Sequence, residues 1–597
     1  MTPPTEAPHS DDPFDWICRS PLGLPPSDQW RFGTLAAMLS AEQPEDDERP
    51  VLLGADHTGP LDITLADVRR AAQRADAWRA EQGLQAGDSV LLVRLPHSSE
   101  APLAVAAVAL MSLGLRVVLP MSFDAATLPE MAAATNCRAV LRCTAEIARS
   151  DDEAVGQADT LFRAVAEQVN ASAFSLDEQL NWHVAPAEKD AAPPPLPGAE
   201  GEAPADRELL VLSTSGSTGR PKLVRYTEAA LLSVAEAWRA AGLMDEQLTG
   251  GRSICPALSH SMGFRNVLHA VWNRQPTLLA QPEWLEEAPK KFVKLLQRCR
   301  PQHITCGPAL LRDLSLLART IQRVKDGLSS LECVVSSGAA DPAAASVLPE
   351  GVRVANAFGM TEVQQALNTL LGSETAPRGA LGRPLPGVAV AVQFDEPQQR
   401  QGRLFVSSPG KARGYVGESD FGEWFETGDV VRVEGDDLVW VGRTGEDFLN
   451  TGQGVKVSLA ELREAYPQLQ AAAEAVLFVS PPSCSGIGAV AYVGEHDPAD
   501  AARQQALREA AEADHQRLAD NGRDFALEYA AVSAIACVAG SPPRRGPGKI
   551  DRQRAIQDAT DLLDALADPA TNNPQIVAVP RFGSDRPDWR RYASDIS

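Results

Sequence analysis

The stretch STSGSTGRPK at residues 213–222 follows an apolar run, ELLVLS (208–213), that predicts a buried strand. Its glycines let a backbone approach an anion closely, and its hydroxyl side chains and N–H groups can surround phosphate oxygens. Lys222 adds a mobile positive charge, at a spacing that differs from that of a Walker loop. A solvated Ser/Gly linker has a similar composition, but the position between a buried strand and an expected helix favours a phosphate site.

The chain around this loop alternates between helical and strand-like apolar patterns. Residues 63–83 carry apolar side chains at helical spacing, and the run SVLLVRLP (89–96) follows after a short turn. Residues 101–120 are almost wholly apolar, yet they contain Arg116 and end in a strand-like Val-Val-Leu-Pro run. We expect a buried helix followed by a core strand there, not a membrane anchor. This alternation predicts a doubly wound α/β fold.

A chain of 597 residues is expected to form at least two domains. Residues 185–206 are rich in proline, alanine and acid, and they predict a flexible surface connection. Short β-like runs with many glycines predict a small β subdomain at 378–443, and further α/β elements follow it. We therefore expect a large N-terminal domain at 1–443 made of doubly wound α/β subdomains and the β subdomain. A small, mobile C-terminal α/β domain at 444–560 and a tail of low regularity at 561–597 complete the expected organisation.

Charge and cysteine usage exclude several classes of partner. The formal net charge is −24, from 79 acidic and 55 basic residues, so neither nucleic acid nor a membrane is expected as a partner. The nine cysteines are scattered without a CxxC pair, which indicates neither a zinc site nor a disulfide framework. The N-terminus is acidic and lacks the apolar core of a signal peptide. We expect a reduced, cytoplasmic setting.

Four segments together resemble the signature of the adenylate-forming superfamily, which contains acyl-CoA synthetases, peptide-synthetase adenylation domains and luciferases. Residues 214–222 match T-S-G-[ST]-T-G-x-P-K, and NAFGMTE at 356–362 resembles N-x-Y-G-x-T-E. WFETGD at 424–429, followed by Gly442-Arg443, resembles W-[FY]-x-T-G-D followed by G-R. PRRGPGKIDR at 543–552 resembles P-R-T-x-x-G-K-[IL]-x-R. The resemblance extends in the family's order from about residue 30 to 555.

The resemblance implies a set of residues that bind ATP and Mg²⁺ and catalyse adenylation. An aromatic residue packs on adenine, a threonine contacts the α-phosphate, a glutamate holds magnesium, an aspartate binds the ribose hydroxyls with help from the arginine, and a lysine promotes adenylation. The implied catalytic residues are Lys549, Thr361, Glu362 (also the metal ligand) and His260. The implied ATP-binding residues are Thr214, Ser215, Gly216, Ser217, Thr218, Gly219, Lys222, Ser337, Gly338, Ala339, Asn356, Phe358, Gly359, Asp429 and Arg443.

The segment at 256–263, PALSHSMG, resembles the family's P-[LM]-x-H-x-x-G, which borders the acyl pocket. This similarity places His260 beside the substrate carboxylate. Members that activate amino acids carry F-D-x-S instead, and the Asp of that pattern binds the substrate ammonium. Residues 258–261, LSHS, have no such Asp, so an α-amino acid is disfavoured as substrate.

Other positions depart from the family's pattern. Gly445 stands where the family has its hinge for domain rotation, and Leu449 replaces a lysine. Residues 452–455, which in the family close the pantetheine tunnel, match poorly. Tyr226-Thr227 stands in place of a Thr-His pair. These departures leave adenylation intact but weaken the prediction of the acceptor.

The expected function is ATP- and Mg²⁺-dependent activation of a non-amino carboxylic acid as acyl-AMP, with release of pyrophosphate. The acyl group then passes to a thiol of coenzyme A or of the phosphopantetheine arm of an acyl carrier protein. Two alternatives remain open. One is an adenylate-forming ligase with an amine or other acceptor, including activation of another oxyacid such as nitrite for diazotisation. The other is a non-catalytic scaffold of the same fold.

Overall fold

The computed structural model describes most of the large N-terminal part and the core of the C-terminal part. The described residues are 14–41, 48–55, 60–94, 100–120, 127–143, 162–167, 172–176, 206–214, 222–244, 252–255, 258, 260–279, 289–337, 348–371, 380–396, 400–443, 448–450, 456–480, 487–520, 531–542, 544–545, 549–550, 562 and 575–578.

A seven-stranded sheet forms the first layer of the large domain, with the strand order β19-β9-β8-β5-β4-β6-β7. Strands β5, β4, β6, β7 and β8 run parallel, whereas β9 is antiparallel to β8 and β19 is antiparallel to β9. The bounds are β4 (Ser89–Val93), β5 (Arg116–Leu119), β6 (Cys137–Cys143), β7 (Ser172–Leu176), β8 (Glu208–Thr214), β9 (Lys222–Thr227) and β19 (Gly414–Tyr415).

A nine-stranded sheet forms the second layer, with the strand order β16-β15-β14-β13-β12-β10-β11-β2-β3. Its central strands, from β14 to β2, are parallel, and antiparallel strands β15, β16 and β3 stand at its edges. The bounds are β2 (Pro50–Ala55), β3 (Pro60–Thr64), β10 (Ser253–Cys255), β11 (Thr277–Leu279), β12 (His303–Cys306), β13 (Cys333–Ser336), β14 (Arg353–Met360), β15 (Gln364–Asn368) and β16 (Arg383–Pro384).

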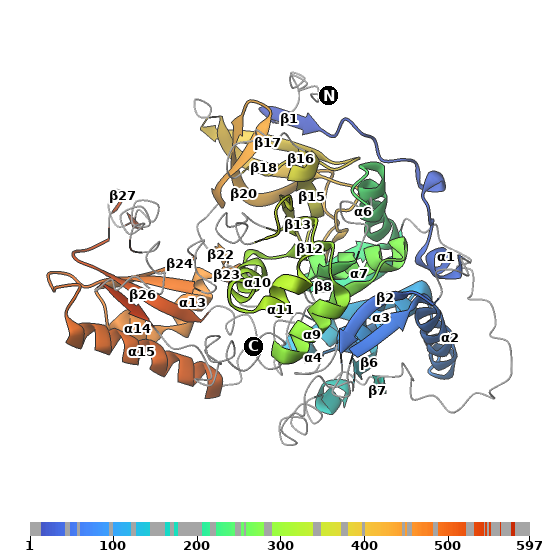
Figure 1. Ribbon diagram of the computed structural model, residues 1–597, viewed down its shortest axis with the longest axis horizontal. Helices are drawn as coiled ribbons and strands as arrows, with labels where there is room; N and C mark the ends of the chain where they lie inside the picture. Colours follow the sequence, from blue (N-terminus) through green and yellow to red (C-terminus); the bar gives the residue numbers. More distant parts are fainter. Residues whose placement is uncertain are drawn as a thin grey trace.

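Helices of the large domain pack between and around these two sheets (Figure 1). Helices α2, α3 and α7 share one hydrophobic core with β4, β5 and β8 of one sheet and β2 of the other. The helix bounds are α1 (Leu35–Ser40), α2 (Leu65–Glu81), α3 (Glu100–Ser112), α4 (Thr127–Ala134), α6 (Glu228–Ala240), α7 (Ser261–Asn273), α9 (Pro289–Cys299), α10 (Pro308–Thr320) and α11 (Gln322–Gly327), with short 3-10 turns at Ser27–Gln29 and Thr369–Leu371. The layered α/β prediction is confirmed.

Two local predictions in this domain are also confirmed. Helix α2 begins after Thr64, whose side chain accepts a hydrogen bond from the Asp67 N–H while Asp67 caps the Thr64 N–H in return. Helix α3 is buried along its whole length and is followed by the core strand β5. Within the described residues, no helix combines the length and apolar character that a membrane span requires.

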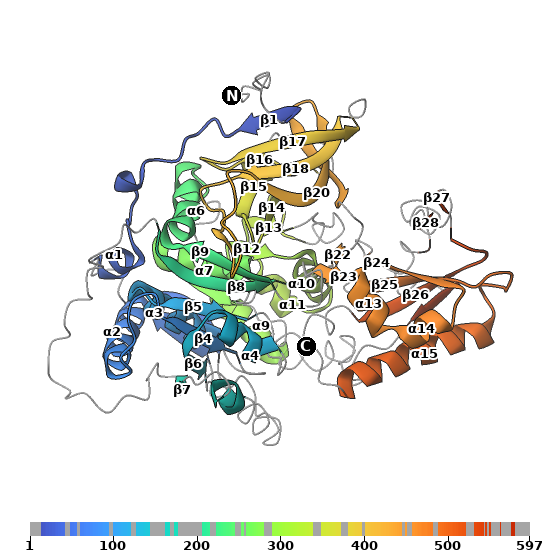
Figure 2. The same cartoon turned by 180° about the vertical axis from the view of Figure 1, so that it is seen from behind.

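The small β subdomain is a five-stranded antiparallel sheet with the order β1-β17-β18-β20-β21 (Figure 2). Its edge strand β1 comes from the N-terminal end of the chain and pairs with β17, a partner that the sequence did not reveal. The bounds are β1 (Trp16–Arg19), β17 (Ala389–Glu396), β18 (Gln401–Ser407), β20 (Phe425–Glu434) and β21 (Asp437–Arg443).

The C-terminal part has its own four-stranded sheet, β24-β25-β26-β29, packed on α14 and α15. Strand β29 comes from the segment 561–597, so the low regularity expected of that tail is wrong at residues 576–578. The bounds are β22 (Phe448–Asn450), β23 (Lys456–Ser458), α13 (Leu459–Ala465), α14 (Pro467–Ala471), β24 (Ala475–Val479), β25 (Ile487–Tyr492), α15 (Ala501–Asp520), β26 (Val532–Val538), β27 (Arg544–Arg545), β28 (Lys549–Ile550) and β29 (Ile576–Ala578).

Candidate active site

The proposed phosphate loop connects two antiparallel strands. Thr214 at the end of β8 pairs directly with Lys222 at the start of β9, so residues 215–221 connect neighbouring points of one hairpin. The helix expected directly after the loop is therefore wrong, because β9 intervenes. Helix α6 begins only after Thr227, whose hydroxyl oxygen accepts a hydrogen bond from the Ala230 N–H at 3.2 Å.

A tyrosine connects this hairpin to the predicted metal ligand. The Lys222 Nζ atom lies 4.7 Å from the centre of the Tyr415 ring. The Tyr415 hydroxyl donates a hydrogen bond to Glu362 Oε1 at 3.0 Å. Burial and the neighbouring Glu362 carboxylate raise the pKa of Tyr415 far above its ordinary value, so this hydroxyl remains a donor. The structure thus brings Lys222 and Glu362 to the same side chain.

Thr361 and Glu362 lie in the turn between β14 and β15. The buried Tyr226 hydroxyl donates a hydrogen bond to the Thr361 carbonyl oxygen and holds the turn from β9. Gly359 lies just before this turn. A side chain does not fit at its position, because a Cβ atom there would lie 2.0 Å from the Gln364 carbonyl oxygen. Close pairing with β15 therefore requires glycine at this position of the motif.

The other residues of this motif continue along β14. Asn356 lies beside Ser336 of β13, and its side-chain amide donates to the Ala380 carbonyl oxygen at 3.3 Å. Phe358 is partly buried against the core of the β subdomain. The family resemblance assigns adenine contacts to these residues, and those contacts remain predictions.

Asp429 lies on β20 and is only 6% exposed. Its Oδ1 atom accepts a hydrogen bond from the Trp440 Nε1 atom at 3.1 Å. Its direct neighbour across the sheet is Arg443 of β21, so the two residues predicted to bind ribose occupy facing positions.

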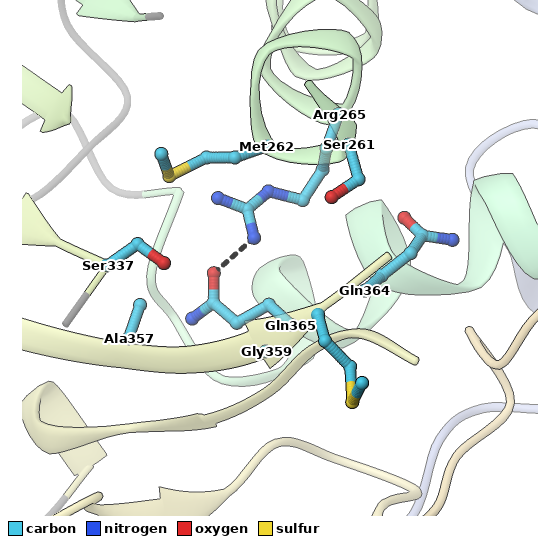
Figure 3. Close-up of a pocket in the computed structure, with 9 residues that line it drawn as sticks. Ser261, Met262, Arg265, Ser337, Ala357, Gly359, Gln364 and Gln365 are labelled. Atoms are coloured by element: carbon cyan, nitrogen blue, oxygen red, sulfur yellow. Dashed lines mark hydrogen bonds between the residues drawn. The ribbon is translucent and has the colours of Figure 1, made fainter. Parts of the chain in front are cut away.

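A cavity unites three of the segments singled out in the sequence (Figure 3). One wall comes from the start of α7, a second from the end of β13, and a third from the β14–β15 hairpin. The lining residues are Ser261, Met262, Arg265, Ser337, Ala357, Gly359, Met360, Gln364 and Gln365. His260 immediately precedes α7, and burial lowers its pKa, which favours the neutral imidazole.

Lys549 is not brought to this cavity. It lies on β28, which pairs with β27 in a small hairpin of the C-terminal part. Figures 1 and 2 both place this hairpin well apart from β14 and β15. Predicted site residues outside the described part of the chain are Ser215, Gly216, Ser217, Thr218, Gly219, Gly338, Ala339 and Gly445.

Four residues near the site were not predicted as functional. Tyr226 had been noted only as a departure from the family's pattern, and Tyr415 lies in no recognised motif. Arg265 and Gln365 line the cavity and contact each other. The position of Arg265 shortly after the His260 segment was the one signal that could have identified it.

Comparisons with known proteins identify the family. The model of the family described as AMP-binding enzyme matches residues 41–416, which is more than half of the chain. A probable non-canonical nonribosomal peptide synthetase, CymA, from Salinispora arenicola is 29% identical over 388 residues, or 60% of this chain and 5% of that protein. Human mitochondrial malonate–CoA ligase is 30% identical over 235 residues, or 34% of this chain and 38% of that protein.

Solved structures share the fold at low identity. The amide bond synthetase McbA from Marinactinospora thermotolerans has a TM-score of 0.60 at 20% identity, covering 88% of this chain and 99% of that one. MatB from Rhodopseudomonas palustris has a TM-score of 0.55 at 20% identity, covering 89% and 99%. The expected adenylate-forming fold is thereby confirmed. Together with the family match, these findings show that the chain belongs to the AMP-binding enzyme family and has the fold of adenylate-forming enzymes.

Proposed function

We propose that this enzyme activates a non-amino carboxylic acid as its acyl-AMP and transfers the acyl group to a thiol of coenzyme A or of a carrier protein. The observation that carries the proposal is the cavity shared by α7, β13 and the β14–β15 hairpin. By family resemblance these three elements belong to the acyl pocket, the adenine side and the α-phosphate side, so the acid and the nucleotide would meet there.

The reaction needs positive charge beside the α-phosphate. A carboxylate oxygen attacks the α-phosphorus of ATP, the α–β phosphoanhydride bond breaks, and pyrophosphate leaves. Negative charge grows on the α-phosphate oxygens during this step, so fixed donors and cations lower the barrier. Lys222 and Thr361 are positioned by Tyr415 and Tyr226, and we assign them to the phosphates. Lys549 would arrive when the small domain closes.

Glu362 is suited to hold Mg²⁺ together with the phosphates. Mg²⁺ typically takes one or two protein carboxylates and completes its shell with phosphate oxygens and water. In the described part of the chain, the hydrogen bond that the Glu362 carboxylate accepts is the one from Tyr415 to Oε1. Its second carboxylate oxygen would serve as the ligand, and the bound ion would neutralise phosphate charge.

The charges around the cavity disfavour an α-amino acid. Among the described residues that line it, the charged side chain is the cation Arg265, and none is a carboxylate. A buried substrate ammonium would therefore lack a partner and would be repelled by the guanidinium.

ATP–pyrophosphate exchange tests the choice of substrate class. Non-amino acids, including aryl, fatty and short-chain acids, should exceed all twenty standard amino acids in kcat/KM. The relatives' names mention different acids, so the panel must be broad. A standard amino acid as the best substrate would contradict this part of the proposal.

The acceptor is tested separately. Acyl-AMP should be consumed faster on addition of coenzyme A or phosphopantetheine than on addition of simple amines. Faster consumption by an amine would favour an amide-forming ligase, and exchange with nitrite alone would indicate the diazotising alternative.

Asp429→Ala should raise the KM for ATP about tenfold or more, because losing a buried acceptor for ribose hydroxyls typically costs about 1–3 kcal/mol. Trp440→Phe is the matched control, since it removes the indole donor of the Asp429–Trp440 hydrogen bond and keeps the carboxylate. The control should leave the ATP KM within about twofold of the parent value. Unchanged ATP affinity in Asp429→Ala, with folding verified by circular dichroism, would contradict the ribose assignment.

A further inference from the structure

Arg265 is a buried cation beside the cavity without a carboxylate partner in the described residues. It lies on α7 and is 5% exposed. Its Nη1 atom donates to Gln365 Oε1 at 2.5 Å, while Nε and Nη2 are buried and find no acceptor in the described part of the chain. The Trp238 ring, 5.4 Å from the guanidinium carbon, offers partial compensation.

Three other arginines of the described chain, two half-buried and one buried, have hydrogen-bond acceptors for their guanidinium groups. Arg207 contacts Glu228 at 2.9 Å, and Arg225 contacts Glu208 at 2.6 Å. Arg274, at the end of the same helix as Arg265, donates to the backbone carbonyls of Val271 and Met38. A buried charge without a partner is costly, so its retention next to a cavity points to a ligand that supplies the partner.

The groups packed around Arg265 do not neutralise it. Burial and the nearby guanidinium lower the pKa of His303 to about 3 and lower that of His269, so both imidazoles are neutral. The Nε2 atom of Gln365 is a donor, and it also has no acceptor in the described residues. The cluster therefore carries one positive charge and several unused polar atoms.

The guanidinium reaches the cavity itself. Figure 3 shows it between Met262 and Ser261, directed across the cavity toward Gln365. We propose that the acid activated here is a dicarboxylic acid, and that Arg265 binds the carboxylate that does not react. This assignment rests on the proposed function, because it places the second carboxylate of the same substrate in the same cavity. The other carboxylate attacks the α-phosphorus and displaces pyrophosphate, and the distal one keeps its charge throughout.

Matched acids test the assignment by ATP–pyrophosphate exchange. Malonate, succinate and glutarate are compared with their monomethyl esters, which keep one reactive carboxylate and lose the distal charge. At least one diacid should exceed its ester in kcat/KM by a factor on the order of 10², because the ester leaves the buried guanidinium unpaired. Ester turnover equal to or greater than diacid turnover for all three pairs would overturn the proposal.

Gln365→Glu provides the sharpest variant. It places a carboxylate at the position from which the amide oxygen already contacts Arg265, so the cation gains an internal partner. Thermal stability should rise, and the preference for the diacid over its ester should fall to about twofold or less. Arg265→Met should lose the same preference. Arg265→Lys keeps the positive charge and should therefore retain part of the preference for the diacid. A purely structural role of Arg265 would not predict this partial retention.

Arg274→Met is the matched control. Arg274 is also buried and directly follows α7, but it is not among the described residues that line the cavity. This variant should lose stability and keep the preference for the diacid.

If Arg265→Met raised the KM for ATP and left acid selectivity unchanged, the arginine would belong to the nucleotide site and the proposal would be wrong. Exchange with monocarboxylic acids alone would overturn the dicarboxylate assignment and leave the adenylation function standing. No exchange with any acid would contradict both.

Discussion

Lys549→Ala is expected to slow acyl-AMP formation by a factor on the order of 10²–10³, with little change in ATP binding. The lysine lies on a hairpin of the C-terminal part, far from the β14–β15 turn in this structure. In the proposed mechanism, closure of the small domain brings it to the α-phosphate, and its charge would then act mainly in the transition state. Single-turnover formation of acyl-AMP measures the loss, and equilibrium ATP binding measures the control quantity.

The same variant separates the two half-reactions. Transfer from chemically supplied acyl-AMP to the thiol should be much less affected, because the small domain is expected to rotate and withdraw the lysine before that step. Arg545→Ala, which removes a cation from the facing strand of the same hairpin, should leave both half-reactions nearly unchanged. Equal losses in both half-reactions of Lys549→Ala would show that the lysine supports the closed state generally.

Glu362→Gln is expected to lower the rate of adenylation about 10²-fold and to raise the Mg²⁺ concentration needed for half-maximal activity. The substitution preserves shape, and the Tyr415 hydroxyl can still donate to the side-chain oxygen. The lost quantity is therefore the negative charge available to the metal. Initial rates over a Mg²⁺ titration give both parameters.

Tyr415→Phe is the control for this experiment. It removes the hydroxyl that contacts Glu362 and keeps both the carboxylate and the ring beneath Lys222. Its Mg²⁺ requirement should remain close to that of the parent protein. An unaltered Mg²⁺ requirement in Glu362→Gln would remove the glutamate from the metal site.

The sequence pattern predicted those helices and strands that are specified by their own residues. The capped helix α2, the buried helix α3 and the strand β8 follow from spacing and apolar runs. Strands β1 and β29 are short and gain their stability from partners far along the chain, β17 and β26, so their own sequences carry little signal. Strand β9, which lies between the glycine-rich loop and the expected helix, was not predicted.

The residues of the candidate site also fall into a group that sequence motifs predict and a group that only the tertiary fold brings together. Thr361, Glu362 and Asp429 were predicted as site residues because each belongs to a contiguous motif. Tyr226 and Tyr415 make contacts between distant segments, including those to the Thr361 carbonyl and the Glu362 carboxylate. Arg265 and Gln365 are 100 residues apart and meet only when α7 packs beside β15. Contacts of this kind depend on the tertiary fold and have no signature along the chain.

The fate of a labelled carboxylate oxygen tests the central claim most directly. The acid labelled with ¹⁸O in its carboxylate is incubated with the enzyme, ATP, Mg²⁺ and the thiol, and the nucleotide product is analysed by mass spectrometry. Attack on the α-phosphorus predicts AMP that carries one ¹⁸O atom, with unlabelled pyrophosphate. Release of unlabelled AMP, or of ADP with labelled phosphate, would contradict adenylation of the acid by this protein.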